Sequence, residues 1–158
     1  MIANGLVMSL IVHLIQLYGG CSDYLIKFIQ TLQNKAAQVV TRLGWRTPTR
    51  TLLLQCGWLS VRQLVEYHSL VLMFKILQDR KPIYIYSQVS TSFARRTRLA
   101  RGGAIRETRT FENDAGKSSF IPRTTKRWNE LTVDIINSVN LKSFKQKVRL
   151  WVRNNVEI

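Results

Sequence analysis

Six arginines lie close together in the middle of the chain, and guanidinium groups at this density are suited to binding phosphate. A guanidinium can donate two parallel hydrogen bonds to a phosphate, and it can also stack on a nucleic-acid base. Gly102 and Gly103 lie among them and would let the backbone approach a ligand closely. We predict a phosphate-binding segment here, with a solvated basic loop as the alternative. The six residues are Arg95, Arg96, Arg98, Arg101, Arg106 and Arg109.

The charge of the whole chain also favours a polyanionic partner. The 158 residues include 24 Lys and Arg but 9 Asp and Glu, which gives a net charge of +15. A compact protein with this imbalance repels itself unless an anion compensates. The excess is +9 in residues 45–110, compared with +2 in residues 1–44 and +4 in residues 111–158. We therefore expect the anion to bind mainly at the middle of the chain.

Trp45 is a second candidate contact. It follows the end of a predicted helix and precedes Arg46, so we predict that Trp45 is a stacking platform for a base and that Arg46 also contacts the nucleic acid. Trp58 and Trp151 instead lie at helical spacing beside apolar neighbours, which is typical of core anchors.

The chain lacks the residue clusters that catalysis would need. Two-metal catalysis requires carboxylates close together, but the aspartates are far apart in the sequence. Cys21 and Cys56 have neither zinc-ligand spacing nor the number for a disulfide framework, and we expect reduced, partly buried thiols. His13 and His68 lie on apolar patterns typical of core or boundary histidines. We therefore expect no catalytic residue, no metal ion, no cofactor and no small-molecule substrate. The aspartates are Asp23, Asp79, Asp114 and Asp134.

Hydrophobic periodicity predicts a mainly α-helical protein. Between Ser22 and Gly44, apolar residues recur every three or four positions, which predicts a long helix capped by Ser22 with one apolar stripe. Such a stripe must be covered, so we expect residues 6–17 to form a core helix against it. The stripe comprises Leu25, Phe28, Ile29, Leu32, Ala36, Val39, Val40 and Leu43.

Two local signals predict where the next helices begin and end. Thr47 followed by Pro48 predicts a helix start with proline in the first helical position, and Gly57 predicts the end of that helix. Ser60 and Gln63 have the spacing of a capping box, which opens a helix reaching to about residue 78. The second half of this helix is apolar on every face, so we expect it at the centre of the core.

The remaining chain is predicted to contain a basic connector and two C-terminal helices. Residues 83–86 could form a strand or a helical turn, and residues 87–92 a loop; residues 104–111 and 118–122 are expected to pair as a short β-hairpin. A short helix around Trp128 and a final amphipathic helix follow. We therefore expect one domain with three parts: a helical core at residues 1–80, a connector at residues 81–124, and C-terminal helices at residues 125–158 that pack on the core. The apolar face of the last helix comprises Leu141, Phe144, Val148 and Trp151.

An ordered series of short motifs resembles a known family. In order and spacing, over residues 12–153, they resemble the C-terminal thumb and post-thumb region of reverse transcriptases from non-LTR (LINE-type) retrotransposons. Two departures are residues 12–14, which replace a Leu-Tyr-Gly tripeptide, and Thr132, which replaces a proline. The motifs are Asn34-Lys35-Ala36, Leu59-Ser-Val-Arg-Gln-Leu64, Tyr67-His-Ser-Leu70, Ser118-Ser-Phe120, Trp128-Asn-Glu-Leu131 and Ser143-Phe-Lys-Gln-Lys147.

The resemblance implies a fragment of an RNA-directed DNA polymerase that lacks the catalytic carboxylates. Such a thumb-like part holds an RNA/DNA template–primer duplex non-specifically, with the missing polymerase core as a second partner, inside the cell and in the nucleus. Three alternatives stay open: a stand-alone basic helical protein-interaction module, a decayed transposon remnant, and a membrane-associated or secreted product led by residues 6–17. A membrane span needs about 20 apolar residues, so we do not expect a membrane partner.

Overall fold

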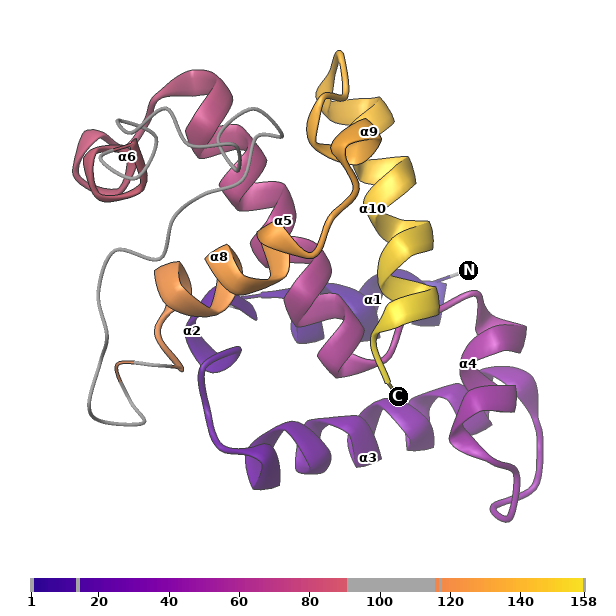
Figure 1. Ribbon diagram of the computed structural model, residues 1–158. Helices are drawn as coiled ribbons and strands as arrows, with labels where there is room; N and C mark the ends of the chain where they lie inside the picture. Colours follow the sequence, from indigo (N-terminus) through magenta and orange to yellow (C-terminus); the bar gives the residue numbers. More distant parts are fainter. Residues whose placement is uncertain (1, 14, 91–115, 117, 158) are drawn as a thin grey trace. The chain divides into compact units, whose positions relative to one another are not determined.

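The computed structural model describes residues 2–13, 15–90, 116 and 118–157 (Figure 1). These residues form helices joined by short turns, and none of them lies in a β-strand. The predicted mainly helical fold is therefore confirmed. The helices are α1 (Ile2–Val12), α2 (Ile15–Tyr18), α3 (Asp23–Thr41), α4 (Thr49–Cys56), α5 (Val61–Asp79), α6 (Ile83–Ser90), α8 (Phe120–Asn129), α9 (Val133–Ile136) and α10 (Leu141–Asn155).

The helices divide between two compact units. The first unit comprises residues 1–65 and 153–158, and the second comprises residues 66–152. Helix α5 therefore begins in the first unit and continues in the second, while the last residues of α10 belong to the first. The ranges that we expected from composition, 1–80, 81–124 and 125–158, stay a prediction.

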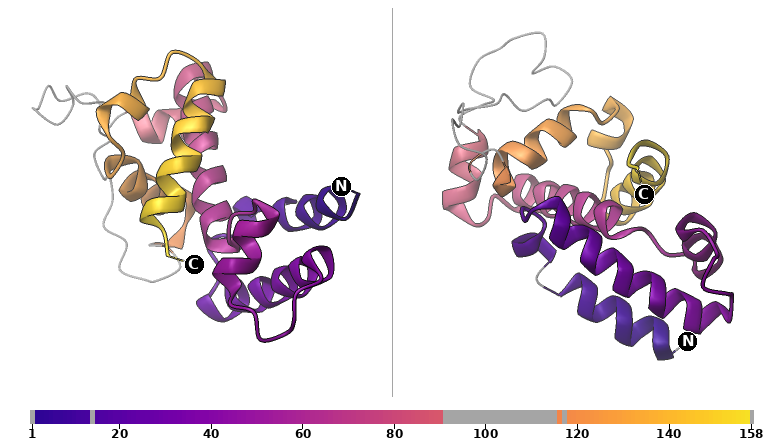
Figure 2. Two further views of the ribbon diagram at one scale, coloured as in Figure 1. Left: turned by 90° about the vertical axis from the view of Figure 1, so that its right-hand side faces the viewer. Right: turned by 90° about the horizontal axis from the view of Figure 1, so that it is seen from below.

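In the first unit, α1 and α3 lie side by side, and α4 packs against α3 (Figure 2). The core of this unit contains Ala37 of α3, Leu52 and Leu53 of α4, and Trp58. The small side chain of Ala37 lets helices approach closely, since the distance between packed helices depends on the side chains at the contact. Trp58 is buried, as we predicted for a core anchor.

The apolar stripe predicted for α3 is not the face that the structure buries. Leu25, Phe28, Leu32, Val39 and Val40 are exposed, while the other members of the stripe are half-buried. The buried residues of α3 are Ile26, Gln33 and Ala37, on the neighbouring face. The prediction of a covered stripe is wrong because α3 turns the face that contains Ala37 toward the core. Gln33 can be buried on this face because its amide donates a 2.8 Å hydrogen bond to the Leu59 carbonyl oxygen.

The expected core helix over residues 6–17 is only partly a core element. Helix α1 contributes Val7 and Met8 to the core around Ala37, whereas Leu6 and Leu10 of α1 and Leu17 of α2 are exposed. The Tyr18 hydroxyl donates a hydrogen bond to the Ile11 carbonyl oxygen, and burial raises the pKa of Tyr18 to about 12. His13 is exposed, so the prediction that it is a core or boundary histidine is wrong. Among the described helices, none is both long and apolar enough to cross a membrane.

The predicted helix caps are confirmed in part. Ser22 precedes α3 but makes no side-chain capping hydrogen bond, and α4 begins after Pro48 rather than at it. At the end of α4, Gly57 has φ of 68° and donates its N–H to the carbonyl oxygens of Leu53 and Leu54. This left-handed position favours glycine, which explains the predicted stop.

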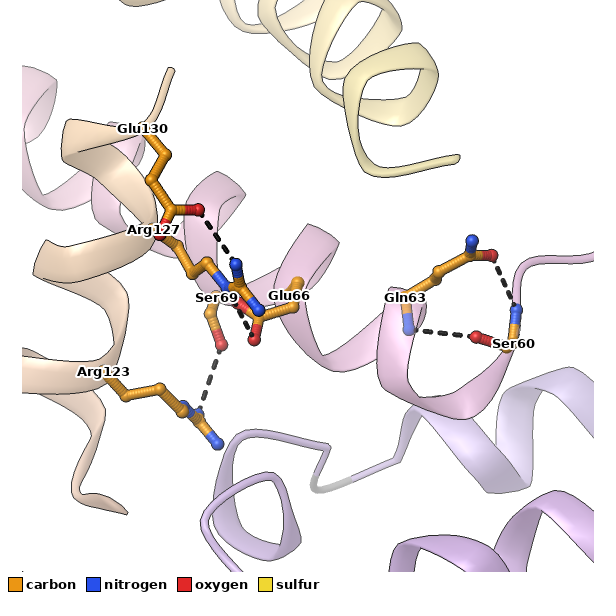
Figure 3. A network of polar contacts seen from close by, with 7 residues as sticks. All are labelled: Ser60, Gln63, Glu66, Ser69, Arg123, Arg127 and Glu130. Carbon is orange, nitrogen blue, oxygen red and sulfur yellow. Dashed lines mark hydrogen bonds and ion pairs between the residues drawn. The ribbon is translucent and has the colours of Figure 1, made fainter. Parts of the chain in front are cut away.

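The predicted capping box at the start of α5 is confirmed (Figure 3). The Gln63 N–H donates to the Ser60 hydroxyl oxygen at 3.2 Å, and the Ser60 N–H donates to Gln63 Oε1 at 3.1 Å. The Gln63 side chain also donates to the carbonyl oxygen of Val156 at 2.9 Å. A pair of residues three apart in the sequence therefore fixes the helix start and also holds a residue near the C-terminus.

In the second unit, aromatic rings from three helices form the core. Phe74 of α5 stacks on Phe144 of α10 with 4.1 Å between ring centroids, and Trp128 of α8 lies 5.8 Å from Phe144. The buried residues of α10 are Phe144, Val148 and Val152, while Trp151 is only half-buried. The amphipathic character predicted for this helix is thus confirmed. The apolar segment of α5 is buried on several faces, as predicted.

Two predictions for the connector are wrong within the described residues. Residues 83–90 form helix α6, so residues 87–90 are not a loop. Residues 120–122 open helix α8 rather than a hairpin strand; residues 104–111, the other expected strand, lie outside the described residues. Pro122 is compatible with a helix there because it lies in the first turn, where the backbone N–H groups have no intrahelical acceptor.

Candidate nucleic-acid interface

The six arginines of the predicted phosphate-binding segment lie outside the described residues. Their placement therefore stays a prediction. The described part of the predicted site is Trp45 and Arg46, which lie in the turn between α3 and α4.

Trp45 is unusually accessible for a tryptophan. Its side chain is 77% exposed, and the Arg46 guanidinium carbon lies 4.7 Å from the centroid of its ring. This geometry is a cation–π contact. It holds the Arg46 guanidinium against the ring that we predicted as a stacking platform, without burying the indole.

Hydrogen bonds hold this turn between the two helices. The Gln38 side chain donates to the Trp45 carbonyl oxygen at 3.4 Å, and the Thr47 N–H donates to the Gly44 carbonyl oxygen at 3.0 Å. Across the two helices, Asn34 Nδ2 donates to Thr49 Oγ1 at 2.8 Å. Because both ends of the turn are tied to helices, Trp45 is presented on an ordered support.

Two further arginines flank the platform. Arg42 ends α3 in a left-handed conformation with φ of 57°, and Arg50 lies in the first turn of α4; both are exposed. We call Arg42, Trp45, Arg46 and Arg50 the Trp45 turn. Among the described residues, no carboxylate forms an ion pair with its three arginines. The turn is therefore a basic surface with an exposed aromatic ring, the combination that binds unpaired nucleotides.

Helix α10 adds a second basic surface, in the second unit. Burial raises the pKa of Tyr67 on α5, and the nearby charge of Arg149 opposes this. Burial, and then the charge of Lys145, lower the pKa of His68. The charge of Arg149 thus acts on Tyr67 and that of Lys145 on His68, and the rings of Tyr67 and His68 meet edge to face at 5.1 Å. The four-residue spacing of Lys145 and Arg149 was the sequence signal for this surface, which we did not include in the predicted site.

A partly buried ion network between α5 and the C-terminal half of α8 was not predicted either (Figure 3). Arg127 Nε lies 3.4 Å from Glu66 Oε1, and Arg127 Nη1 donates to Glu130 Oε2 at 2.9 Å. Arg123 donates to the Ser69 hydroxyl oxygen at 3.3 Å. Glu66 is an acidic residue between Val65 and Tyr67, and this was the available sequence signal. Because Arg127 is bound to two carboxylates, the network is suited to holding helices together rather than to binding a ligand.

A groove of about 390 Å³ lies in the second unit between α5, α6, α8 and α9. Its lining is mostly apolar and includes Phe74, Leu77, Tyr86 and Ile136. It brings together no acid, base and nucleophile, so it offers no catalytic set.

Within the described residues, no three His, Cys, Asp or Glu side chains are close enough together to hold a metal ion. Cys21 and Cys56 are free thiols; Cys21 is exposed, and burial raises the pKa of Cys56. The chemistry available at the two basic surfaces is thus electrostatic binding and stacking. Neither a family model, nor a curated protein, nor a solved structure matches this chain.

Proposed function

We propose that the chain is the C-terminal, thumb-like part of a non-LTR retrotransposon reverse transcriptase and binds template–primer phosphates. Three features support the proposal: the ordered motif series, the net charge of +15 and the Trp45 turn. The observation that carries it is the exposed Trp45 ring with the Arg46 guanidinium over it. The parent protein would be an RNA-directed DNA polymerase acting in the nucleus, and its polymerase core would be the second partner.

Binding in this role needs no base readout. Arginines that contact phosphate oxygens fix a nucleic acid in place without sequence preference. The bases of a duplex are already stacked on each other, so Trp45 would stack on an unpaired template base or at the end of the duplex. The six arginines and Trp45 would then contact different parts of the nucleic acid: the arginines bind the phosphate backbone, and Trp45 stacks on one base.

The salt dependence of duplex binding tests the phosphate contacts. If the six arginines each neutralise a phosphate, the logarithm of the association constant should fall by about 4 to 5 per tenfold increase in salt. Replacing Arg95, Arg96 and Arg98 by alanine should reduce this slope by about 2 to 3. Filter binding of an RNA/DNA duplex over a series of salt concentrations measures both slopes.

A matched variant controls for the loss of net charge. Lys75, Arg80 and Lys126 are exposed cations outside the predicted segment, and changing them to alanine removes the same charge. We expect this variant to change the slope by less than about one unit. Equal slopes for the two triple variants would mean diffuse attraction rather than a binding segment, and a wild-type slope near zero would remove the proposed function.

Trp45→Ala tests the stacking platform. Base–aromatic stacking is worth about 1–3 kcal/mol, so we expect affinity for a single-stranded oligonucleotide to fall by about 5- to 150-fold. Because the ring is 77% exposed, the free energy of unfolding should change by no more than about 0.5 kcal/mol. Fluorescence anisotropy and urea denaturation measure the two effects. Tyr84→Ala, which removes another exposed ring, is the control, and equal losses for both variants would contradict a role specific to Trp45.

A further inference from the structure

The exposed face of α3 has the residue spacing of a coiled-coil seam. Leu25, Phe28, Leu32, Lys35 and Val39 are separated alternately by three and four residues, which is the a/d pattern of a heptad repeat. All five side chains are exposed, Phe28 to 57% and Val39 to 78%. We call these five residues the α3 seam. It extends for about 21 Å along the helix, at 1.5 Å per residue, which is long enough to contact several turns of another helix.

Contacts on the opposite side of α3 fix the outward direction of the seam. Gln33 Nε2 donates to the Leu59 carbonyl oxygen at 2.8 Å, and Gln30 Oε1 accepts a 2.8 Å hydrogen bond from the Val61 N–H. Ala37 is fully buried in the core. Rotating α3 to bury the seam would break both hydrogen bonds and remove Ala37 from the core. The seam is therefore held outward, where its apolar side chains gain hydrophobic stabilisation only when something covers them.

The charges around the seam indicate what kind of partner fits. Lys35 lies within the seam, Lys27 is exposed on α3, and Arg42 is exposed at the C-terminal end of α3. Asp23 is the only acidic residue of α3. Asp23 is already bound to Arg62 at 2.6 Å. A second copy of the chain would thus add its own cations without bringing an available carboxylate from α3. A partner with carboxylates at these places would complement the surface.

We propose that the α3 seam binds an acidic amphipathic helix of another protein, with apolar residues at its a and d positions and carboxylates facing Lys35 and the neighbouring cations. A lysine in the middle of a seam costs stability but selects partners, because only a helix with an acid opposite it avoids an unpaired buried charge. The site lies on the side of α3 that the core leaves open, uses none of the six arginines predicted to bind phosphate, and shares only Arg42 with the Trp45 turn. It therefore extends the proposed function rather than depending on it.

A designed peptide serves as the probe. It has about four heptads with leucine at a and d, glutamate at e and g, and one glutamate at a central d position to face Lys35. A peptide of the same composition in scrambled order controls for attraction to the net charge of +15. Binding of the labelled peptides to the full chain is measured by fluorescence anisotropy. We expect the heptad peptide to bind at least about tenfold more tightly than the scrambled one.

Variants of the chain then locate the peptide. Phe28→Ser together with Leu32→Ser should weaken binding of the heptad peptide by about tenfold or more. Leu54→Ser changes an exposed leucine of α4 outside the seam and should have little effect, and circular dichroism checks that each variant keeps its helix content. Lys35→Glu should weaken binding of the acidic peptide and strengthen binding of a peptide that has lysine in place of the central glutamate. This exchange of preference cannot result from a general loss of folding.

Four results would overturn the proposal. The first is a scrambled peptide that binds as tightly as the heptad peptide, and the second is a Leu54→Ser variant that weakens binding as much as the seam variant. The third is a dimer of the chain, seen in sedimentation, that the seam variant dissociates, since a second copy then covers the seam. The fourth is binding of vesicles with an anionic phosphatidylserine fraction through the seam while the heptad peptide does not bind, since the surface is then lipid-binding.

Discussion

Phe144→Ala is expected to lower the free energy of unfolding by about 3–5 kcal/mol, one of the largest effects of any single substitution in this chain. The Phe144 side chain is fully buried, with Phe74 stacked on it at 4.1 Å and Trp128 at 5.8 Å. Alanine would remove the central ring of this aromatic cluster and leave a cavity between α5, α8 and α10. Urea denaturation followed by circular dichroism measures the loss as a lower midpoint.

Leu150→Ala is the matched control for that experiment. Leu150 lies on the same helix, but its side chain is 63% exposed. Its replacement by alanine should change the free energy of unfolding by no more than about 0.5 kcal/mol. If the two variants were equally stable, α10 would not pack through the face that contains Phe144.

Arg127→Met is expected to lower the free energy of unfolding by about 2–3 kcal/mol near pH 7. The side chain of Glu66 is only 10% exposed, and Arg127 Nε lies 3.4 Å from it, so removing the guanidinium leaves a buried carboxylate with less compensation. This loss in the free energy of unfolding is small for the removal of one partner of a buried ion pair, because Arg127 itself is about one-third exposed. Methionine keeps much of the apolar stem of arginine and so limits the loss of packing.

The pH dependence identifies Glu66 as the cause of this loss. Burial raises the pKa of Glu66 from its ordinary value of 4.5, and the charges of Arg127 and Arg123 only partly oppose the rise. Stability from this carboxyl group is therefore fully present below about pH 4.5 and falls as the pH rises through the raised pKa. Arg127→Met raises that pKa further, so its cost should grow between about pH 4 and pH 7.

The pKa of Arg127 shifts in the opposite sense to what burial alone would cause. Burial lowers it, but the hydrogen bond to Glu130 and the charge of Glu66 outweigh burial and raise it overall. The pair thus favours a charged arginine while the carboxyl group resists ionisation. We attribute this difference to depth, since Glu66 is the more buried partner.

A double variant separates the charge effect from other losses. Glu66→Gln removes the buried charge, so Arg127→Met combined with Glu66→Gln should be more stable than Arg127→Met alone near pH 7, by about 1–2 kcal/mol. The double variant should also lose most of the pH dependence. If Arg127→Met lowered the free energy of unfolding equally at about pH 4 and pH 7, Glu66 would not be the group that causes the loss of stability.

The sequence was most informative where a structure depends on neighbouring residues. The capping box of Ser60 and Gln63 and the glycine stop at Gly57 were predicted because each involves residues within one turn of a helix. The amphipathic face of α10 was predicted because Phe144 and Val148, which are buried, recur at helical spacing within one helix. For the candidate site, the sequence indicated Trp45 as a stacking platform next to Arg46, and the structure places the Arg46 guanidinium over the exposed ring. The function of that pair stays a prediction.

What only the tertiary structure decided is which apolar surfaces are covered. Periodicity showed that α3 has an apolar stripe, but Ala37 and Gln33 determine the buried face, because Ala37 packs in the core and Leu59 supplies an acceptor for Gln33. The contact of Glu66 with Arg127 likewise joins residues far apart in the sequence, which no local pattern encodes. The sequence by itself thus determined the long helices α3, α5 and α10 and the excess of positive charge, since both depend on local composition. The packing of distant helices decided that the α3 seam faces outward, because burial depends on the long-range contacts that each side chain makes.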